Sequence, residues 1–545
     1  MKKNVLALSI TAALIGFGFA GGAQAIGLNK ATGNPITVGA GDHLETSVDG
    51  TGQFLYVPYY TVQGGNVTMM NIVNTDTVNG KAVKVRFRAA ANSDDVMDFQ
   101  VFLSPGDVWA AGVYQDTTSA KNTRLVTADT SCTKPTKTVL NATAFSTVRL
   151  DTLHRTGDAL VNEAREGYVE IFNMADIPPV VSTSSLFQSI KHTAGVPRNC
   201  ASAAFTALNT DPDTLAIANG YGLAVPTTGL MANWIILNAA NSGAWSGASP
   251  ALNAVTSLGA ITTGALVYFP QTDDLIPNPA ALGLTATQRV AQFTSDPWLI
   301  AHAADVNPVL RTYDLPDFSI PYTAATTPNE QVVLLSQAIS TRKVMNEYLT
   351  DEPSLIADTD WVLSMPTRRY SAAYDYTVTP DGVALYNTGL SAFYFTAANT
   401  FVLDGQICTK GLTTLYFDRE ETTPGPLSTG VIVSPQPPGQ AAAGFNICGE
   451  ASVLSFNNSD AVTSGLVKAA SGALGATVAR STIETLDGSN HYTNGWLTIN
   501  TPGITPTGGV PNGLPILGYE AVKALSTGTH AFGATLPHRT DRIQK

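Results

Sequence analysis

Short stretches of alternating apolar and polar residues dominate the chain between residues 53 and 113. In residues 81–88, the apolar Val83, Val85 and Phe87 alternate with basic side chains. This period of two is typical of a β-strand with one face in a core, so we expect the basic face of this strand to lie in water. The same region predicts further strands at residues 54–57, 59–62, 67–73, 99–103 and 108–110.

Strand patterns continue almost to the end of the chain. They are separated by turn residues such as Pro105 and Gly106, and their spacing of about ten residues is typical of an antiparallel sandwich. The sequence therefore predicts an all-β fold with minor helix, an antiparallel β-sandwich with immunoglobulin-like strands in its N-terminal part. The later predicted strands are residues 167–172, 233–237, 361–365, 414–417, 431–433, 452–456 and 495–499.

One helix is predicted from Pro328 to Ser340, because Thr327 and Glu330 form a capping-box pattern and Pro328 suits the first helical position. A second short helix is expected over residues 342–349. Residues 201–327 are rich in Ala, Thr, Asn and Pro and have weaker periodicity, which indicates a long irregular insertion. We expect it to separate an N-terminal β-sandwich region (26–200) from a C-terminal β region (328–545), in one domain or two.

The first 25 residues have the pattern of a cleaved export signal. A basic start, Met1–Asn4, precedes an uncharged apolar stretch, and Ala23-Gln24-Ala25 is a small-x-small cleavage site. We expect the mature chain to begin at Ile26 and to be extracellular or on the cell surface, with the periplasm as the alternative. No later run of 18 apolar residues occurs, so no membrane span is expected after cleavage.

The composition argues against polyanion binding. Charged residues make up 13% of the chain, and 30 basic against 42 acidic residues give a formal charge of −12. Loss of Lys2 and Lys3 with the leader would make this charge more negative by two. We therefore do not expect nucleic acid as a partner, because a protein that binds its phosphates needs cations to neutralise them.

Four cysteines, Cys132, Cys200, Cys408 and Cys448, would enter an oxidising compartment as two disulfides. Three connectivities are possible. We favour Cys132 with Cys200 and Cys408 with Cys448, since each pair then lies within one half of the chain.

Catalytic motifs are not found, and the sequence predicts no catalytic residue. The seven histidines include no H-E-x-x-H pattern, which a zincin requires. Acidic pairs at residues 94–95, 273–274 and 420–421 offer two carboxylates for a glycosidase, but solvated turn residues are the preferred interpretation.

Alternate acidic residues in short loops can converge on one calcium ion. The candidate calcium ligands are Asp211, Asp213, Asp358 and Asp360.

Aromatic and basic residues provide candidate binding positions. Trp109 and Trp361, with Tyr56, Tyr59, Tyr60, Tyr370 and Trp496, are candidates for a sugar-stacking platform, although core packing is the preferred interpretation. Arg368 and Arg369, like Arg86 and Arg88, form concentrated positive patches. For them we favour pairing with carboxylates of the same or a neighbouring subunit.

Several segments together resemble a family of uncharacterised exported, surface-associated β proteins of Gram-negative bacteria. They include V-P-Y-Y-T-V at 57–62, F-L-S-P-G-D-V-W at 102–109, D-W-V-L-S-M-P-T-R-R at 360–369 and G-L-P-I-L-G at 513–518. The likeness covers most of the mature chain and is weakest in the middle insertion. It implies export and a β fold, and it carries over no catalytic residue.

These observations predict an exported, non-enzymatic structural or interaction protein of the bacterial cell surface. Its expected partners are copies of itself, in a layer, sheath or filament, or other cell-surface components. No cofactor is expected apart from calcium. The alternative is a secreted polysaccharide-binding module or glycoside hydrolase.

Overall fold

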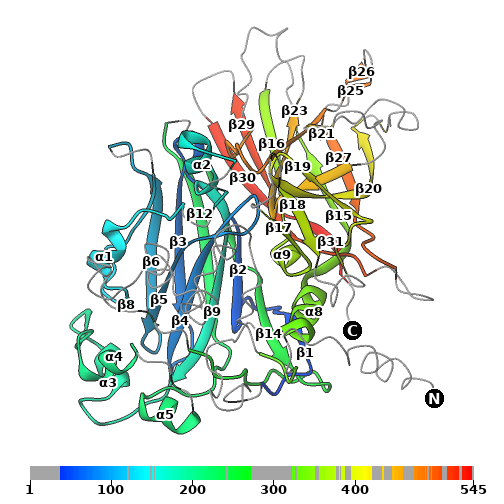
Figure 1. The fold of residues 1–545 in the computed structure, drawn as a ribbon. Helices are drawn as coiled ribbons and strands as arrows, with labels where there is room; N and C mark the ends of the chain where they lie inside the picture. Colours follow the sequence, from blue (N-terminus) through cyan, green and yellow to red (C-terminus); the bar gives the residue numbers. More distant parts are fainter. Residues whose placement is uncertain are drawn as a thin grey trace, which may run out of the picture.

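Two β-rich halves lie side by side in the computed structural model, one built from strands β1 to β14 and the other from β15 to β31 (Figure 1). The predicted all-β fold with few helices is confirmed. The immunoglobulin-like character of the N-terminal part stays a prediction. The structure describes residues 37, 39–118, 122–147, 150–151, 154–209, 212, 214–240, 243–268, 271, 322–325, 328–349, 355–375, 380, 382–386, 394–419, 421, 433–434, 445–457, 472–484, 486–487, 490–491, 494–505, 512–526 and 531–542.

The N-terminal half contains two antiparallel sheets that enclose a common core. The larger, seven-stranded sheet has the order β1 (His43–Thr46), β14 (Ala251–Val255), β2 (Phe54–Thr61), β9 (Glu166–Ile177), β4 (Gly80–Ala89), β5 (Asp95–Leu103) and β8 (Cys132–Lys134). The five-stranded sheet has the order β13 (Gly243–Ala248), β12 (Leu230–Asn238), β3 (Val67–Asn74), β6 (Val108–Gln115) and β7 (Thr123–Val126).

The C-terminal half also contains two large sheets. The six-stranded sheet has the order β21 (Val433–Ser434), β24 (Arg480–Glu484), β23 (Ala451–Asn457), β16 (Leu355–Ser364), β29 (Leu517–Ser526) and β30 (Ala531–Pro537), with β23 and β24 parallel. The seven-stranded sheet has the order β19 (Thr400–Leu403), β20 (Gln406–Asp418), β27 (Gly495–Asn500), β15 (Ser340–Tyr348) and β28 (Leu514–Pro515), with β22 (Phe445–Cys448) on β20 and β31 (Arg539–Arg542) on β15.

Small elements complete the fold, and three of the helices gather at one end of the N-terminal half (Figure 1). The helices are α1 (Lys137–Ala142), α2 (Gly157–Glu163), α3 (Leu186–Ile190), α4 (Ala203–Ala207), α5 (Leu215–Gly220), α8 (Pro328–Ile339), α9 (Arg368–Ser371) and the 3₁₀ turn η1 (Gln63–Gly65). The two-stranded ladders pair β10 (His192–Thr193) with β11 (Val196–Pro197), β17 (Ala372–Asp375) with β18 (Val383–Tyr386), and β25 (Leu486–Asp487) with β26 (Asn490–His491). No helix in the part of the chain described above is both long and apolar enough to cross a membrane.

The six-stranded sheet of the C-terminal half contributes to two cores, because successive strand residues point to opposite faces. Trp361 and Leu363 of β16 belong to the core between the two C-terminal sheets. Val362, between them, joins the core of the N-terminal half, as does Tyr519 of β29. The ring of Tyr519 stacks on Trp234 of β12 with centroids 4.4 Å apart. The two halves therefore share a hydrophobic core.

The helix predicted at Pro328–Ser340 is confirmed as α8, which buries Val332, Leu335 and Ile339 in this shared core. The second helix, expected over residues 342–349, is wrong: this segment belongs to strand β15. Val344, Asn346 and Tyr348 are buried there, whereas Glu347 is exposed, so the side chains follow the strand period of two.

The middle segment, 201–327, is not simply an irregular insertion. Its strands β12 and β13 form one edge of the five-stranded sheet, and β14 lies between β1 and β2 in the larger sheet. These three strands belong to the N-terminal sandwich, so the boundary expected at residue 201 does not follow the sheets. The strand predicted at residues 233–237 is confirmed as part of β12, but the composition of the segment did not show that this strand joins the N-terminal sheets.

The basic face of β4 is buried, which corrects the expectation that it lies in water. Lys84, Arg86 and Arg88 are at most 1% exposed. The opposite face of β4 packs toward the five-stranded sheet, while this polar face is covered by later segments of the chain: Tyr268 donates to Gln100 on the neighbouring strand at 2.8 Å, and Gln271 donates to the backbone oxygen of Asp98 at 2.9 Å.

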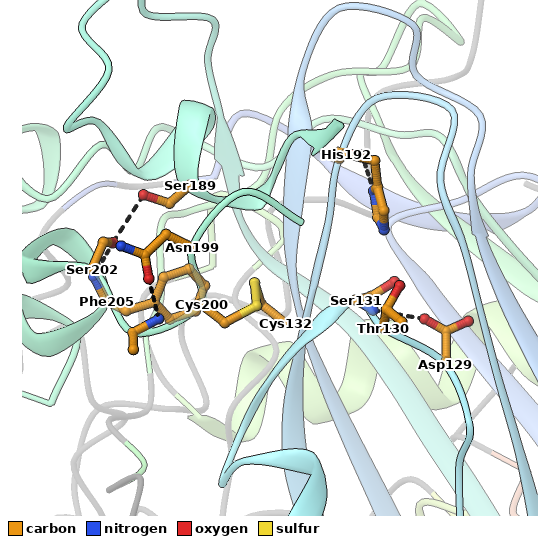
Figure 2. The surroundings of a disulfide bond; sticks show 12 residues. Asp129, Thr130, Ser131, Cys132, Ser189, His192, Asn199, Cys200, Ser202 and Phe205 are labelled. Carbon is orange, nitrogen blue, oxygen red and sulfur yellow. Dashed lines mark hydrogen bonds between the residues drawn. A yellow bond between two sulfur atoms is a disulfide. The ribbon is translucent and has the colours of Figure 1, made fainter. Parts of the chain in front are cut away.

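Both favoured disulfides are confirmed, Cys132–Cys200 and Cys408–Cys448. Figure 2 shows the first, which ties the start of edge strand β8 to the segment before α4. Beside it, Ser202 caps α4 by accepting from the Phe205 amide, and its hydroxyl also accepts from Ser189 at 2.8 Å. The second disulfide joins directly paired residues of β20 and β22.

Candidate functional site

Arg368 and Arg369, two of the predicted binding residues, are buried where the two halves meet. Arg368 Nη2 lies 3.3 Å from Glu450 Oε1, and Arg369 Nη2 lies 3.6 Å from Oε1 of Glu170. Both arginines are at most 1% exposed. Their pairing with carboxylates of the same chain is the interpretation preferred from the sequence, and it leaves neither guanidinium facing a ligand in solution.

These ion pairs belong to a larger group that we call the junction cluster: Arg88, Tyr168, Glu170, Arg368, Arg369 and Glu450. Arg88 Nε lies 3.2 Å from Glu170 Oε2, so two arginines share one carboxylate. The Tyr168 hydroxyl donates to Glu450 Oε2 at 3.3 Å, and burial raises the pKa of that phenol. Because buried charges need partners to remain ionised, the junction cluster fixes how the halves meet.

Trp109 and Trp361 are fully buried, with 0% of each residue exposed. Trp109 packs against Phe99, and Trp361 contacts Phe456 and His538. A sugar can stack only on a ring face that it can reach, so the sugar-stacking interpretation does not fit these two residues. Trp496 differs, since it is 37% exposed and stacks on Phe417 with centroids 5.1 Å apart.

The structure describes one of the two acidic pairs that were predicted to bind calcium. Asp358 and Asp360 lie on one face of β16, two residues apart, and are 6% and 0% exposed. Burial, together with the nearby Asp358 carboxyl, raises the pKa of Asp360 to about 7. Among the residues that the structure describes, no group of three metal-ligating side chains converges. Asp211 and Asp213 lie outside the described residues, and calcium binding stays a prediction.

The acidic pairs considered for a glycosidase are scattered. Asp94 and Asp95 are buried near the end of β4, in the turn and strand that follow it. Glu421 lies at a left-handed backbone position, with φ of 63°. Glu420, Asp273 and Asp274 lie outside the described residues. The described members therefore do not form the facing carboxylate pair that glycoside hydrolysis needs.

One broad surface feature of the described chain was not singled out by the sequence. We call it the outer face: the side of the five-stranded sheet that points away from the core. Cross-strand pairing arranges its side chains in four rows. The rows are Met231–Val73–Val108, then Ala248–Asn233–Asn71–Ala110, then Ser246–Ile235–Met69–Gly112–Val126, and last Ala244–Leu237–Val67–Tyr114–Arg124.

The outer face carries almost no charge. Arg124, at its edge, is the single charged residue in these rows of the described sheet, and it is paired with Asp116 at 2.7 Å. Val108, Val126 and Ile235 are 45%, 44% and 40% exposed. The strands β3, β6 and β12 were each predicted, but the sequence could not show that residues 67–73 and 230–237 are neighbours.

The outer face is a broad surface. Five strands about 4.8 Å apart and rows about 6.7 Å apart give a total area of roughly 600 Å². This total includes the polar residues Asn71, Asn233, Ser246, Tyr114 and Arg124, so the apolar part lies within the range of about 300–600 Å² for the largest apolar patch on a typical monomer. A standard interface buries about 800 Å² on each partner, so this face could form most of one.

Comparisons with known proteins yield no relative: no family model, no curated protein and no solved structure matches this chain.

Proposed function

We propose that this chain is an exported structural protein of the bacterial cell surface whose copies associate through the outer face. The observation that carries the proposal is the uncharged, exposed surface of strands β12, β3 and β6. Burying such a surface is favourable in proportion to its apolar area. The leader-like residues 1–25 and the two disulfides support export.

Charge favours a second copy of this chain as the occupant of the outer face. The chain has a formal charge of −12, so most contacts between copies would place carboxylates against carboxylates. Contact through the outer face avoids that repulsion because its rows lack acidic side chains. Two sheets can pack face to face about 10 Å apart, as they do inside a sandwich.

The test is the oligomeric state of residues 26–545 in a dilution series by analytical ultracentrifugation. We expect concentration-dependent association that Ile235→Lys and Met69→Lys abolish, since each would bury a lysine at the centre of the interface. Leu415→Lys is the matched control: Leu415 is 46% exposed on β20, on the other half. Strictly monomeric wild-type protein at high concentration, or association that Ile235→Lys leaves unchanged, would overturn the proposal.

The polysaccharide-binding alternative is favoured by one observation, the exposed stack of Trp496 on Phe417. An accessible indole face is the group on which a sugar ring packs. Glycan-array binding that Trp496→Ala removes would support this function. Phe532→Ala, at an aromatic residue 65% exposed on β30, provides the control.

A further inference from the structure

A cavity of about 360 Å³ opens between the two halves. Ala159 and Asn162 of α2 line it from the N-terminal half. Residues 403–406 of the β19–β20 turn and residues 477–480 line it from the C-terminal half. Small-molecule sites occupy about 300–1,000 Å³ and often lie between domains, so this cavity suits a ligand of about the size of one sugar.

Arg480 lines this cavity with a side chain that makes no hydrogen bond within the described chain. Its Nε atom is buried without an acceptor, although the residue as a whole is half-buried. An arginine stays charged under all ordinary conditions. A half-buried guanidinium whose Nε lacks an acceptor is therefore stabilised when a complementary anion binds it.

Asp360 compensates this charge only in part. The Asp360 carboxyl interacts electrostatically with Arg480, but burial raises the pKa of that carboxyl to about 7. Its Oδ2 atom already accepts from the Leu474 amide at 2.7 Å. Near neutral pH the negative charge on Asp360 is thus incomplete, and the guanidinium fork of Arg480 remains open to another oxyanion.

Arg155, the other arginine of the cavity, forms part of its wall. Its Nε lies 2.6 Å from Glu163 Oε1, and its Nη2 donates to the backbone oxygen of Asp404. This arginine links α2 to the β19–β20 turn across the cavity. It leaves Arg480 as the anion-binding group.

The remaining polar lining suits hydroxyl groups. Asn162, Asp404, Gln406 and Ser452 bring amide, carboxylate and hydroxyl groups to the cavity, and these groups both donate and accept hydrogen bonds. Two donors of the second arginine, Arg155, are taken by Glu163 and by the backbone oxygen of Asp404, so they are not directed at a dianion such as phosphate. The lining thus matches one carboxylate together with several hydroxyls.

We propose that this cavity binds a small hydroxylated carboxylate of the sugar-acid class, with the carboxylate paired to the guanidinium of Arg480. Planar bidentate pairing is the strong mode of arginine–carboxylate recognition. The site does not depend on association through the outer face, and a monomeric chain would bind the ligand equally well.

The experiment is isothermal titration calorimetry of residues 26–545 with glucuronate, glucose and inorganic phosphate. We expect glucuronate to bind, and glucose and phosphate to bind at least tenfold more weakly. Arg480→Met should weaken glucuronate binding by tenfold or more. Arg539→Met, at an exposed arginine of β31, should leave it unchanged.

A second variant covers the case in which Arg480→Met fails to fold. Ala159 is exposed on α2 and lines the cavity, so Ala159→Tyr should block the cavity without disturbing the core. Equal binding of glucose, tighter binding of phosphate, or glucuronate binding that survives Ala159→Tyr would each overturn the proposal.

Discussion

Glu170 in the N-terminal half and Arg369 in the C-terminal half form a buried ion pair, with Oε1 and Nη2 3.6 Å apart. The same carboxylate lies 3.2 Å from Arg88 Nε. One acidic residue therefore lies beside a cation of each half at their junction and compensates their charge in part. Its side chain is 1% exposed, so water contributes little to its stabilisation.

Glu170→Gln should destabilise the protein more than any exposed ion-pair variant does. Removing one partner of a buried pair typically costs about 3–5 kcal/mol, because the other charge remains buried without compensation. Here the variant leaves two arginines with less compensation. The free energy of unfolding from urea denaturation is the measurement.

Arg124→Met is the matched control for this effect. Arg124 pairs with Asp116 at 2.7 Å, but its side chain is 20% exposed. Such surface pairs contribute about 0–1 kcal/mol. If Glu170→Gln cost no more than Arg124→Met, the junction cluster would not contribute to the stability of the interface between the halves.

The buried carboxyls predict that stability falls as the pH rises from about 4 to about 8. Burial raises the pKa of Asp360 from 3.8 to about 7 and that of Glu163 from 4.5 to about 8. Between these values the folded state binds more protons than the unfolded state. The stability that these two groups contribute is therefore complete below about pH 4 and is lost as the pH rises through 7 and 8.

Asp360→Asn, which mimics the protonated carboxyl, should make stability less dependent on pH. Between pH 5 and pH 8 the wild type should lose about 2–3 kcal/mol relative to this variant. Urea denaturation at the two pH values gives the difference, in which the contributions of the other titrating groups cancel. Asp49→Asn, at an exposed carboxyl whose pKa is lowered by hydrogen bonds from Ser47 and Thr51, should follow the wild type. Parallel pH profiles for wild type and Asp360→Asn would contradict the assignment.

The two disulfides should differ in their resistance to reductant. Cys200 is exposed, whereas Cys408 is fully buried. A reductant reaches an exposed sulfur first, so mild dithiothreitol followed by alkylation and mass spectrometry should label Cys132 and Cys200 before the other pair. Simultaneous labelling of all four cysteines would instead mean that opening requires global unfolding.

Replacing either pair with serines should also lower the free energy of unfolding. The linked residues are 68 and 40 positions apart. The loop-entropy relation then gives about 4 kcal/mol for each pair.

Sequence patterns identified single strands well but not the partners of those strands. The periodicity of residues 67–73 and 81–88 placed β3 and β4 within a residue or two. The environment of β4 was wrong, because the groups that cover Lys84, Arg86 and Arg88 come from residues far along the chain. A local pattern records which positions share a face, but it does not record what lies opposite that face.

The same limit applies to the candidate sites. The rows of the outer face join residues such as Met69 and Ile235, which are paired only through the register of β3 and β12. The cavity joins Arg155 and Arg480 through the packing of the two halves. Each segment has an ordinary local sequence, so the juxtaposition is visible only in three dimensions. The disulfides differ in this respect. The assumption that each cysteine pairs within its own half of the chain was enough to predict both of them.

The export prediction rests on the leader sequence and can be tested on the protein in cells. Small residues at Ala23 and Ala25 are the feature that the cleavage reaction requires, so mass spectrometry of the fraction outside the cytoplasm should find a mature N-terminus at Ile26 and no free thiols. Ala25→Asp should block this cleavage, whereas Gln24→Ser, at the tolerant middle position, should not. A chain that keeps Met1 in the cytoplasm with four reduced cysteines would contradict export, and with it the compartment in which both disulfides and a surface assembly are expected to form.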